Sequence, residues 1–190
     1  MEGVVIGLTG ANAAGKGEVA LYLATLGFRS HSLSDIVREE ALARGLGVER
    51  EHLIRVGNDL RRAGGPGVLA ERILPRLGAR DVVDSIRNPG EVEVLRRATR
   101  FVLLAVDAPE AVRFERSRAR GREGDPLTLE AFREREREEN SSDPDAQRLL
   151  ETFRLADRTL LNDGTIDDLK SRVDLALRAF SRGGDPTPRV

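Results

Sequence analysis

The chain of 190 residues has no cysteine, no tryptophan, one methionine and one tyrosine. The absence of cysteine excludes disulfide bonds and metal sites built on thiolates. No apolar run approaches the roughly 20 residues that a membrane-spanning helix needs. The 31 basic and 32 acidic residues balance, which argues against a general nucleic-acid-binding protein. We therefore expect a cytoplasmic protein, a monomer or a homodimer, with neither membrane nor nucleic acid among its partners.

Lysine is also scarce, because only two of the 31 basic residues are lysines. One of them, Lys16, ends a glycine-rich turn. An apolar run at 4–9 precedes this turn, and a helix-compatible stretch at 18–26 follows it. The residues of the turn are Gly10, Ala11, Asn12, Ala13, Ala14, Gly15 and Lys16.

This spacing matches the Gly-x-x-x-x-Gly-Lys core of a phosphate-binding loop (P-loop). Backbone N–H groups and the helix N-terminus would face the phosphates, and the Lys16 ammonium would bridge the outer ones. The motif usually continues with Ser or Thr, which ligates magnesium, but here Gly17 and Glu18 follow. We predict that the loop from Gly10 to Glu18 binds ATP. The alternative is a glycine-rich turn that carries a surface lysine.

Apolar runs bounded by turn residues alternate with helical patterns along the chain. The runs predict strands at 4–9, 28–32, 82–85, 101–106 and 159–161. The helical patterns cover 16–26, 34–44, 50–63, 67–77, 90–99, 108–119, 128–139, 144–154 and 166–181. This alternation predicts an α/β fold of three layers, with a five-stranded parallel sheet covered by helices on both faces.

We expect a single domain over residues 1–182 with a flexible tail at 183–190. Its core would comprise 1–33, 78–115 and 141–182. The segment 34–77 is a helical insertion, far longer than one crossover needs, and 116–140 is a charge-rich lid. Insertions at the carboxyl edge of a parallel sheet are where substrate-binding flaps belong, although decorative surface helices remain an alternative for part of each.

Two aspartates end apolar runs and are candidates for a magnesium site. Asp107 is accounted for as the N-cap of the next helix, because Asp107-Ala-Pro-Glu110 has the pattern of a capping box, as does Thr165-Ile-Asp-Asp168. Asp84 has no such local role. We therefore predict that Asp84, and not Asp107, is the carboxylate that serves Mg²⁺.

Arginines at fixed spacings are candidates for binding phosphate. Arg87 lies three residues after Asp84, and Arg116 and Arg120 project from one helix face. A second group, Arg133, Arg135 and Arg137, alternates with glutamates and indicates a solvated helix with ion pairs. For the two histidines, His31 and His52, we predict no catalytic role.

Together these motifs resemble the P-loop nucleoside monophosphate kinases and, in places, dephospho-CoA kinase. The loop is similar to that of adenylate kinases, in which Gly follows the lysine and Thr comes next, where this chain has Glu18. The segment from Ser32 to Arg38 resembles the start of the monophosphate-binding subdomain. Asp84 to Arg87 resembles the segment whose aspartate serves magnesium and whose arginine holds the acceptor phosphate.

The resemblance implies a kinase that transfers the γ-phosphoryl group of ATP, with Mg²⁺, to a nucleoside or deoxynucleoside monophosphate. It assigns Lys16, Asp84, Arg87, Arg116, Arg120 and Asp35 to catalysis, Asn162 and Gly164 to the adenine side, and Ser34, Asp35, Arg38 and Arg87 to the acceptor.

Two alternatives stay open. A dephospho-CoA-kinase-like enzyme would phosphorylate a ribose hydroxyl and would use Asp35 as its base. A regulatory protein would bind ATP without turnover, consistent with Glu18 in place of the hydroxyl.

Overall fold

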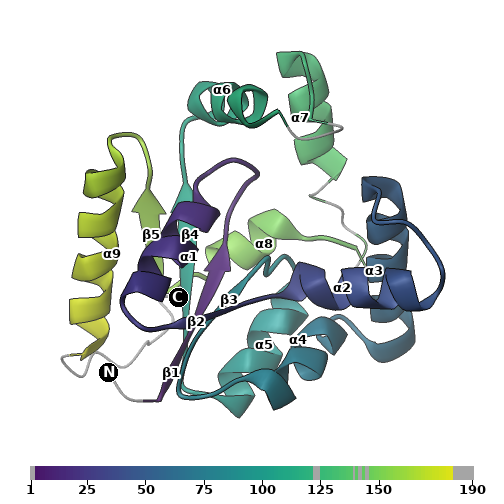
Figure 1. Ribbon diagram of the computed structural model, residues 1–190, viewed down its shortest axis with the longest axis horizontal. Coiled ribbons are helices and arrows are strands. Elements are labelled where there is room, and N and C mark those ends of the chain that lie inside the picture. Colours follow the sequence, from purple (N-terminus) through teal and green to yellow (C-terminus); the bar gives the residue numbers. More distant parts are fainter. Residues whose placement is uncertain (1–2, 122–124, 139, 141–142, 144–145, 182–190) are drawn as a thin grey trace.

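The computed structural model describes residues 3–121, 125–138, 140, 143 and 146–181. The tail predicted at 183–190 lies outside these residues. The described chain forms one five-stranded sheet with the strand order β2-β3-β1-β4-β5, and every pair is parallel (Figure 1). The strands are β1 (Val4–Thr9), β2 (Arg29–Ser32), β3 (Arg80–Asp84), β4 (Phe101–Asp107) and β5 (Arg158–Leu161). The predicted fold class and all five strands are confirmed.

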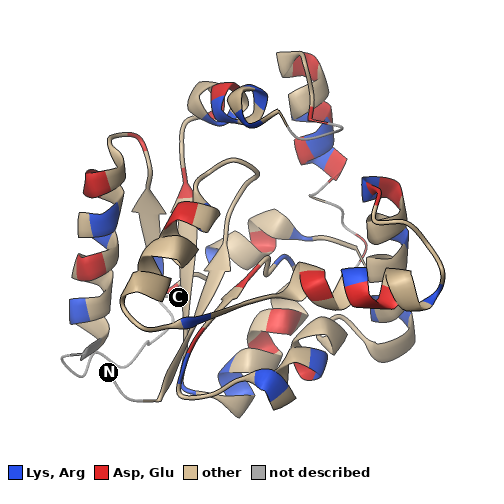
Figure 2. Cartoon of the chain, in the orientation of Figure 1, with Lys and Arg blue, Asp and Glu red and all other residues tan. Residues whose placement is uncertain are grey.

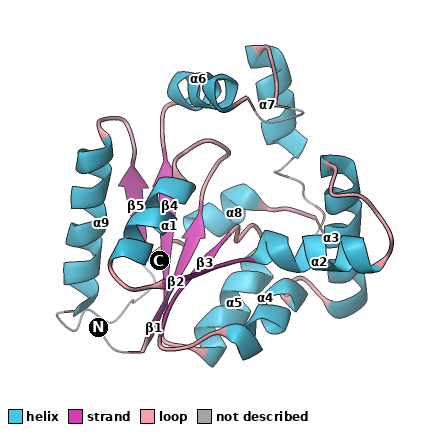
Figure 3. Cartoon of the chain, in the orientation of Figure 1, coloured by secondary structure: helices cyan, strands magenta, loops and turns pink. Residues whose placement is uncertain are grey.

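Helices connect the strands and cover the sheet (Figure 3). They are α1 (Lys16–Thr25), α2 (Leu33–Ala43), α3 (Arg50–Gly64), α4 (Val68–Ile73), a 3-10 turn at Leu74–Arg76, α5 (Pro89–Ala98), α6 (Glu110–Arg120), α7 (Leu129–Glu138), α8 (Leu149–Arg154) and α9 (Ile166–Ser181). Pro89 occupies the first turn of α5, as predicted, because its fixed φ suits a helix start.

The sheet separates two apolar cores, so the molecule has three layers. Successive side chains of a strand point to opposite faces. Ile6 of β1 therefore packs with α1 and α9, while its neighbour Val5 packs with α2 to α5. All six residues of β1 are buried, as expected for the central strand of a parallel sheet. Gly7 is needed here, because a Cβ at this position would lie 2.3 Å from the Phe101 ring.

The strand order reverses at β1, with β3 on one side and β4 on the other. In parallel sheets, ligands bind at the carboxyl ends of the strands, beside such a reversal. The loop before α1 and the segment after β3 meet at this edge, and α6 and α7 extend above it (Figure 1).

The start of α6 corrects one prediction. Asp107 does not cap the helix: the N-cap residue is Pro109, and the Asp107 carboxylate accepts a hydrogen bond from the Ala108 amide at 2.9 Å. Asp107 is the last residue of β4, paired in register with Leu161, so it lies too early in the chain to reach the first turn. The capping pair Thr165 and Asp168 is confirmed by reciprocal hydrogen bonds.

Helices α6 and α7 form one charged unit (Figure 2). The Arg113 guanidinium binds the Glu136 carboxylate, and Phe114 packs edge-on against Phe132 with the ring centroids 5.7 Å apart. Arg113 also donates to the carbonyl of Ala108 at 2.9 Å, which ties this unit to the end of β4. We call α6 and α7 the arginine hairpin.

Asp81 in β3 is fully buried and joins β2 to β3. Its carboxylate accepts hydrogen bonds from Arg29 at 2.9 Å and from the Gly78 amide at 2.6 Å, and His31 lies 3.1 Å away. Burial raises the pKa of Asp81, but these hydrogen bonds and the charges of His31 and Arg29 outweigh it, so the pKa lies below its usual value.

Within the described residues, no helix is both long enough and apolar enough to span a bilayer.

Candidate functional site

The glycine-rich turn after β1 has a backbone that only small residues allow. Gly10 and Gly15 have φ angles of 133° and 109°. A Cβ at Gly10 would lie 2.1 Å from the Val106 carbonyl oxygen, and one at Gly15 would lie 2.2 Å from the Asn162 amide nitrogen. The Lys16 ammonium donates to the carbonyls of Gly10 at 2.7 Å and Ala11 at 2.9 Å, so it lies against the turn.

This turn forms one wall of a cavity of about 660 Å³, which we call the loop cavity. Most residues predicted to bind ATP, to hold magnesium or to act in catalysis line it. They are Asn12, Ala13, Gly15, Lys16, Gly17, Glu18, Asp84, Arg87, Arg116, Arg120, Asn162 and Gly164. Gly10, Ala11 and Ala14, which were also predicted to bind ATP, shape the turn without lining the cavity. Asp107, which was set aside in favour of Asp84, does not line the cavity either.

A second cavity of about 410 Å³ lies beside the helical insertion, and we call it the insertion cavity. Apolar residues from α2 to α4 form part of its wall, including Leu33, Val37, Leu53, Ile54 and Leu69. Six arginines also line it, against one carboxylate, Asp125. They are Arg38, Arg50, Arg61, Arg87, Arg120 and Arg135. This lining suits an anion that carries an apolar body.

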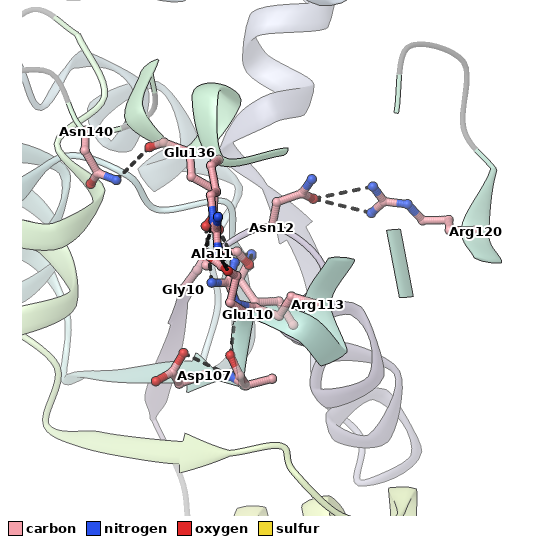
Figure 4. Close-up of polar contacts among 12 residues, drawn as sticks. Gly10, Ala11, Asn12, Asp107, Glu110, Arg113, Arg120, Glu136 and Asn140 are labelled. Atoms are coloured by element: carbon pink, nitrogen blue, oxygen red, sulfur yellow. Dashed lines mark hydrogen bonds and ion pairs between the residues drawn. The ribbon is translucent and has the colours of Figure 1, made fainter. Parts of the chain in front are cut away.

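Four residues line both cavities: Asn12, Ser85, Arg87 and Arg120. They mark where the contents of the two cavities meet. The Arg120 guanidinium lies 3.5 Å from the Asn12 side-chain oxygen, across the gap between the arginine hairpin and the loop (Figure 4). Arg87 donates to the Gln147 side chain at 2.8 Å. The shared boundary is thus polar and holds two guanidinium groups, of which that of Arg120 is also paired with Asp125 at 2.9 Å.

Ser85 has an unusual backbone, with φ of 64° in the left-handed region that glycine favours. The next residue, Ile86, is held at both its carbonyl and its amide. The Thr9 hydroxyl donates to the Ile86 carbonyl at 2.8 Å, and the Ile86 amide donates to the Leu8 carbonyl. The Ser85 amide donates to the Asp84 carboxylate at 2.6 Å, and Ser32 donates to the Ser85 hydroxyl at 3.1 Å. Strain of this kind is typical of functional sites.

The acceptor residues predicted on α2 are only partly brought together. Arg38 and Ser34 line the insertion cavity, and the Arg38 guanidinium donates to the Ser34 hydroxyl at 2.8 Å. Asp35 does not line it. Its carboxylate is paired with Arg38 at 2.6 Å, and its side chain is 57% exposed.

Asn162, just after β5, connects three parts of the site. Its side-chain amide donates to the Ala14 carbonyl at 2.8 Å, and Arg116 donates to its backbone carbonyl at 3.2 Å and its side-chain oxygen at 3.4 Å. The predicted residues Asn162 and Arg116 therefore share one contact network with the turn.

The loop cavity has oxygen donors that suit magnesium. Mg²⁺ is commonly held by one or two carboxylates together with phosphate oxygens and water. Asp84, Glu18 and the Ser85 hydroxyl line the cavity. Within the described residues, no group of three or more His, Cys, Asp or Glu side chains forms a metal cage. The residues present thus fit a magnesium ion that arrives with a nucleotide.

Comparison with known proteins identifies the family. No family model matches the chain. A UPF0200 protein from Thermococcus gammatolerans is 33% identical, covering 95% of this chain and all of its own length, and one from Pyrococcus abyssi is 35% identical, covering 92% of this chain and 96% of its own. The chain belongs to the UPF0200 family.

Solved structures show the fold that this UPF0200 chain shares. A Thermus thermophilus protein, TT1252, is 27% identical with a TM-score of 0.58, over 95% of this chain and 98% of its own. Shikimate kinase from Aquifex aeolicus has the same TM-score at 12% identity, over 95% and 99% of the two chains. A gluconokinase from Sinorhizobium meliloti has a TM-score of 0.51 at 17% identity, over 94% and 97%.

The fold of the UPF0200 chain is thus that of P-loop small-molecule kinases, as predicted at this level. The narrower resemblance to nucleoside monophosphate kinases stays a prediction.

The structure also places residues of the UPF0200 chain that sequence reasoning missed. The prediction for Arg135 is right about the ion pair and wrong about the exposure: the side chain pairs with Asp125 at 3.6 Å, but it is only 18% exposed and lines the insertion cavity. Gly57, Arg61 and Gln147 also line that cavity and were not singled out. For Gly57 a signal was present, because a glycine inside a helical pattern costs about 1 kcal/mol relative to alanine and so marks an unusual position.

Proposed function

We propose that this UPF0200 protein is an ATP-dependent kinase that transfers the γ-phosphoryl group to a nucleoside or deoxynucleoside monophosphate. ATP would occupy the loop cavity and the acceptor the insertion cavity. The shared boundary of Asn12, Ser85, Arg87 and Arg120 would then be the place of transfer.

The glycine-rich turn supports the proposed binding of ATP, the phosphoryl donor. Its backbone amides and the N-terminus of α1 would hold the β and γ phosphates, and the Lys16 ammonium would exchange the carbonyls of Gly10 and Ala11 for phosphate oxygens. Asp84 would hold magnesium together with those oxygens, and the ion would neutralise phosphate charge. Arg116 and Arg120, from the arginine hairpin, would stabilise charge on the group in transfer.

The acceptor class is supported by one observation. Among the described residues, no carboxylate lines both cavities, whereas two arginines do. A hydroxyl acceptor must lose a proton and benefits from a carboxylate base. A monophosphate oxygen is already anionic. It can attack the γ phosphorus directly, while the bond from that phosphorus to the β–γ bridging oxygen breaks and ADP leaves. Arg87 and Arg38 would hold the acceptor phosphate.

The dephospho-CoA-kinase-like alternative has less support. It requires Asp35 as a base, and the Asp35 carboxylate is paired with Arg38 and lies outside the insertion cavity lining.

Replacing Lys16 tests the donor site. Lys16→Ala should weaken ATP binding by about 10- to 100-fold, because it removes a charge-assisted phosphate contact worth about 1.5–3 kcal/mol. Isothermal titration calorimetry with Mg·ATP measures this change. The matched control is Lys170→Ala, the only other lysine, which makes an exposed ion pair with Asp167 on α9 and should bind ATP like the native protein.

A coupled assay of ADP release tests the reaction itself, over ribo- and deoxynucleoside monophosphates and dephospho-CoA. ADP formed with a monophosphate supports the proposal. Turnover with dephospho-CoA alone would favour the alternative acceptor. Tight ATP binding without ADP release for any acceptor would identify a regulatory nucleotide-binding protein.

A further inference from the structure

Helix α3 has a glycine in its interior, at a position that faces the insertion cavity. Gly57 is buried and lies midway along the 15 residues of Arg50–Gly64. Glycine is less favourable than alanine in a helix interior, because it loses more backbone freedom on folding. The missing side chain at this position therefore has a stability cost, and its surroundings indicate what offsets it.

Packing within the protein does not require this glycine. A Cβ at Gly57 would lie 3.5 Å from Nη1 of Arg61 and 3.8 Å from the Val37 methyl groups, which is ordinary van der Waals contact. By contrast, a Cβ at Gly67 would lie 2.5 Å from Val94, and one at Gly90 would lie 2.8 Å from Pro66. Gly57 has helical backbone angles, with no positive φ. A methyl group at Gly57 would therefore occupy space in the insertion cavity.

Arg61 lies one turn further along α3, and its side chain is only 5% exposed. Its Nε and Nη2 atoms donate to Glu91 Oε1 at 3.3 and 2.9 Å. Glu91 is completely buried, and its other oxygen accepts the backbone amides of Arg87 at 2.8 Å and Asn88 at 3.1 Å. The guanidinium is therefore held on one edge, while Nη1 lies beside Gly57 in the cavity wall.

We infer that Gly57 and Arg61 form the floor on which the acceptor's ring lies, and that they select its base. This inference rests on the proposed function. A flat base would cover Gly57 among the apolar side chains of Val37 and Leu53, and a carbonyl oxygen on the base would accept a hydrogen bond from Arg61 Nη1. Uracil, thymine and guanine present such an oxygen, whereas adenine presents an amino donor at the matching edge. The acceptor is thus a monophosphate of uracil, thymine or guanine.

Calorimetry on the full chain tests the floor with four probes: UMP, GMP, AMP and ribose 5-phosphate. The native protein should bind UMP or GMP at least about 10-fold more tightly than AMP and ribose 5-phosphate. Gly57→Ala should weaken UMP and GMP by about 10-fold or more, leave ATP and ribose 5-phosphate unchanged, and keep or raise the melting temperature. Arg61→Lys, which keeps a cation beside Glu91, should remove the preference over AMP.

Asn58→Ala is the matched control, because it raises helix propensity at the next residue of α3, which does not line the insertion cavity. Equal binding of UMP and GMP by Gly57→Ala and the native protein would overturn the inference, as would binding of AMP by the native protein as tightly as UMP and GMP. These two outcomes differ from a failure of the proposed kinase, in which the native protein would bind no ATP or no monophosphate at all.

Discussion

Single residues at the cavity boundary combine backbone strain with polar contacts. Ser85 adopts a left-handed backbone that costs a non-glycine residue about 1–3 kcal/mol. The hydrogen bonds of Ile86 with Thr9 and Leu8 hold the chain in this conformation. The same geometry sets the Ser85 amide against the Asp84 carboxylate. One strained residue therefore fixes the orientation of the side chain proposed to hold magnesium.

Two substitutions distinguish the effect of the Ser85 hydroxyl from the effect of the Ser85 backbone conformation. Ser85→Ala and Ser85→Gly should both lower kcat by about 2- to 10-fold, because each removes the hydroxyl that lines the proposed place of transfer, together with its hydrogen bond from Ser32, worth about 0.5–1.5 kcal/mol. Ser85→Gly should be more stable than Ser85→Ala by about 1 kcal/mol, because glycine adopts positive φ without steric cost. Steady-state kinetics and thermal unfolding measure both effects. Ser30→Ala, on the exposed surface of β2, is the control. Native kcat in both Ser85 variants would contradict a role for the Ser85 hydroxyl at the place of transfer.

Short sequence patterns predicted many residues of the candidate site but missed buried arginines such as Arg61. Lys16, Arg87 and Asn162 were found because short motifs or turns mark them, and all three line the loop cavity. Arg61 was missed because nothing local distinguishes it among 29 arginines: its burial depends on Glu91, 30 residues further along the chain. Arg135 was missed for a similar reason, since alternation with glutamates is typical of exposed helices.

At the level of elements, apolar runs predicted the central strands β1, β3 and β4 because these strands are largely buried in the sheet. The boundaries of helices were less certain. The N-cap prediction at Asp107 failed because β4 continues through this residue in register with β5, which a local pattern does not reveal.

The edge of the sheet at β2 depends on one carboxylate. Because the pKa of Asp81 is lowered in the folded protein, its contribution to stability is present at neutral pH. It is lost as the pH falls from the unfolded value of about 4 through the folded pKa. The native protein should therefore lose stability progressively below about pH 4.

Asp81→Asn should lower the free energy of unfolding at pH 7 by about 1–3 kcal/mol and flatten its dependence on pH below about 4. Urea unfolding over that pH range measures both. Glu39→Gln is the control, because Glu39 pairs with Arg76 at an exposed position, and it should cost about 0.5 kcal/mol or less. An unchanged acid slope in Asp81→Asn would assign the pH dependence to other carboxylates.

At the scale of the whole molecule, the two cavities share a boundary, so their ligands should influence each other. Arg120 comes from the arginine hairpin and lines both cavities, and its contacts to Asn12 across the gap are long, at 3.5 Å. Contacts of this length are weak, and a phosphate between the two residues would replace them with charge-assisted bonds.

We expect a bound monophosphate to tighten the binding of a non-hydrolysable ATP analogue by about fivefold or more, and the analogue to tighten the monophosphate by the same factor. Arg120→Ala should remove most of this coupling. Arg118→Ala, an exposed neighbour on α6 that lines neither cavity, should preserve it. Calorimetric titrations of each ligand with and without the other measure the factor. Independent binding in the native protein would contradict a shared transfer point.

The buried carboxylate of Glu91 has a consequence for how this family can diversify. It holds the Arg61 side chain and the backbone at Arg87 at once, so the base selection and the phosphate binding proposed for these two residues depend on the same group. Loss of Arg61 alone would strand a negative charge in the protein interior, at a cost of several kcal/mol. Relatives in which position 61 carries no positive charge should therefore have lost the carboxylate at position 91 as well, and paired exchange at these two sites would mark such subfamilies.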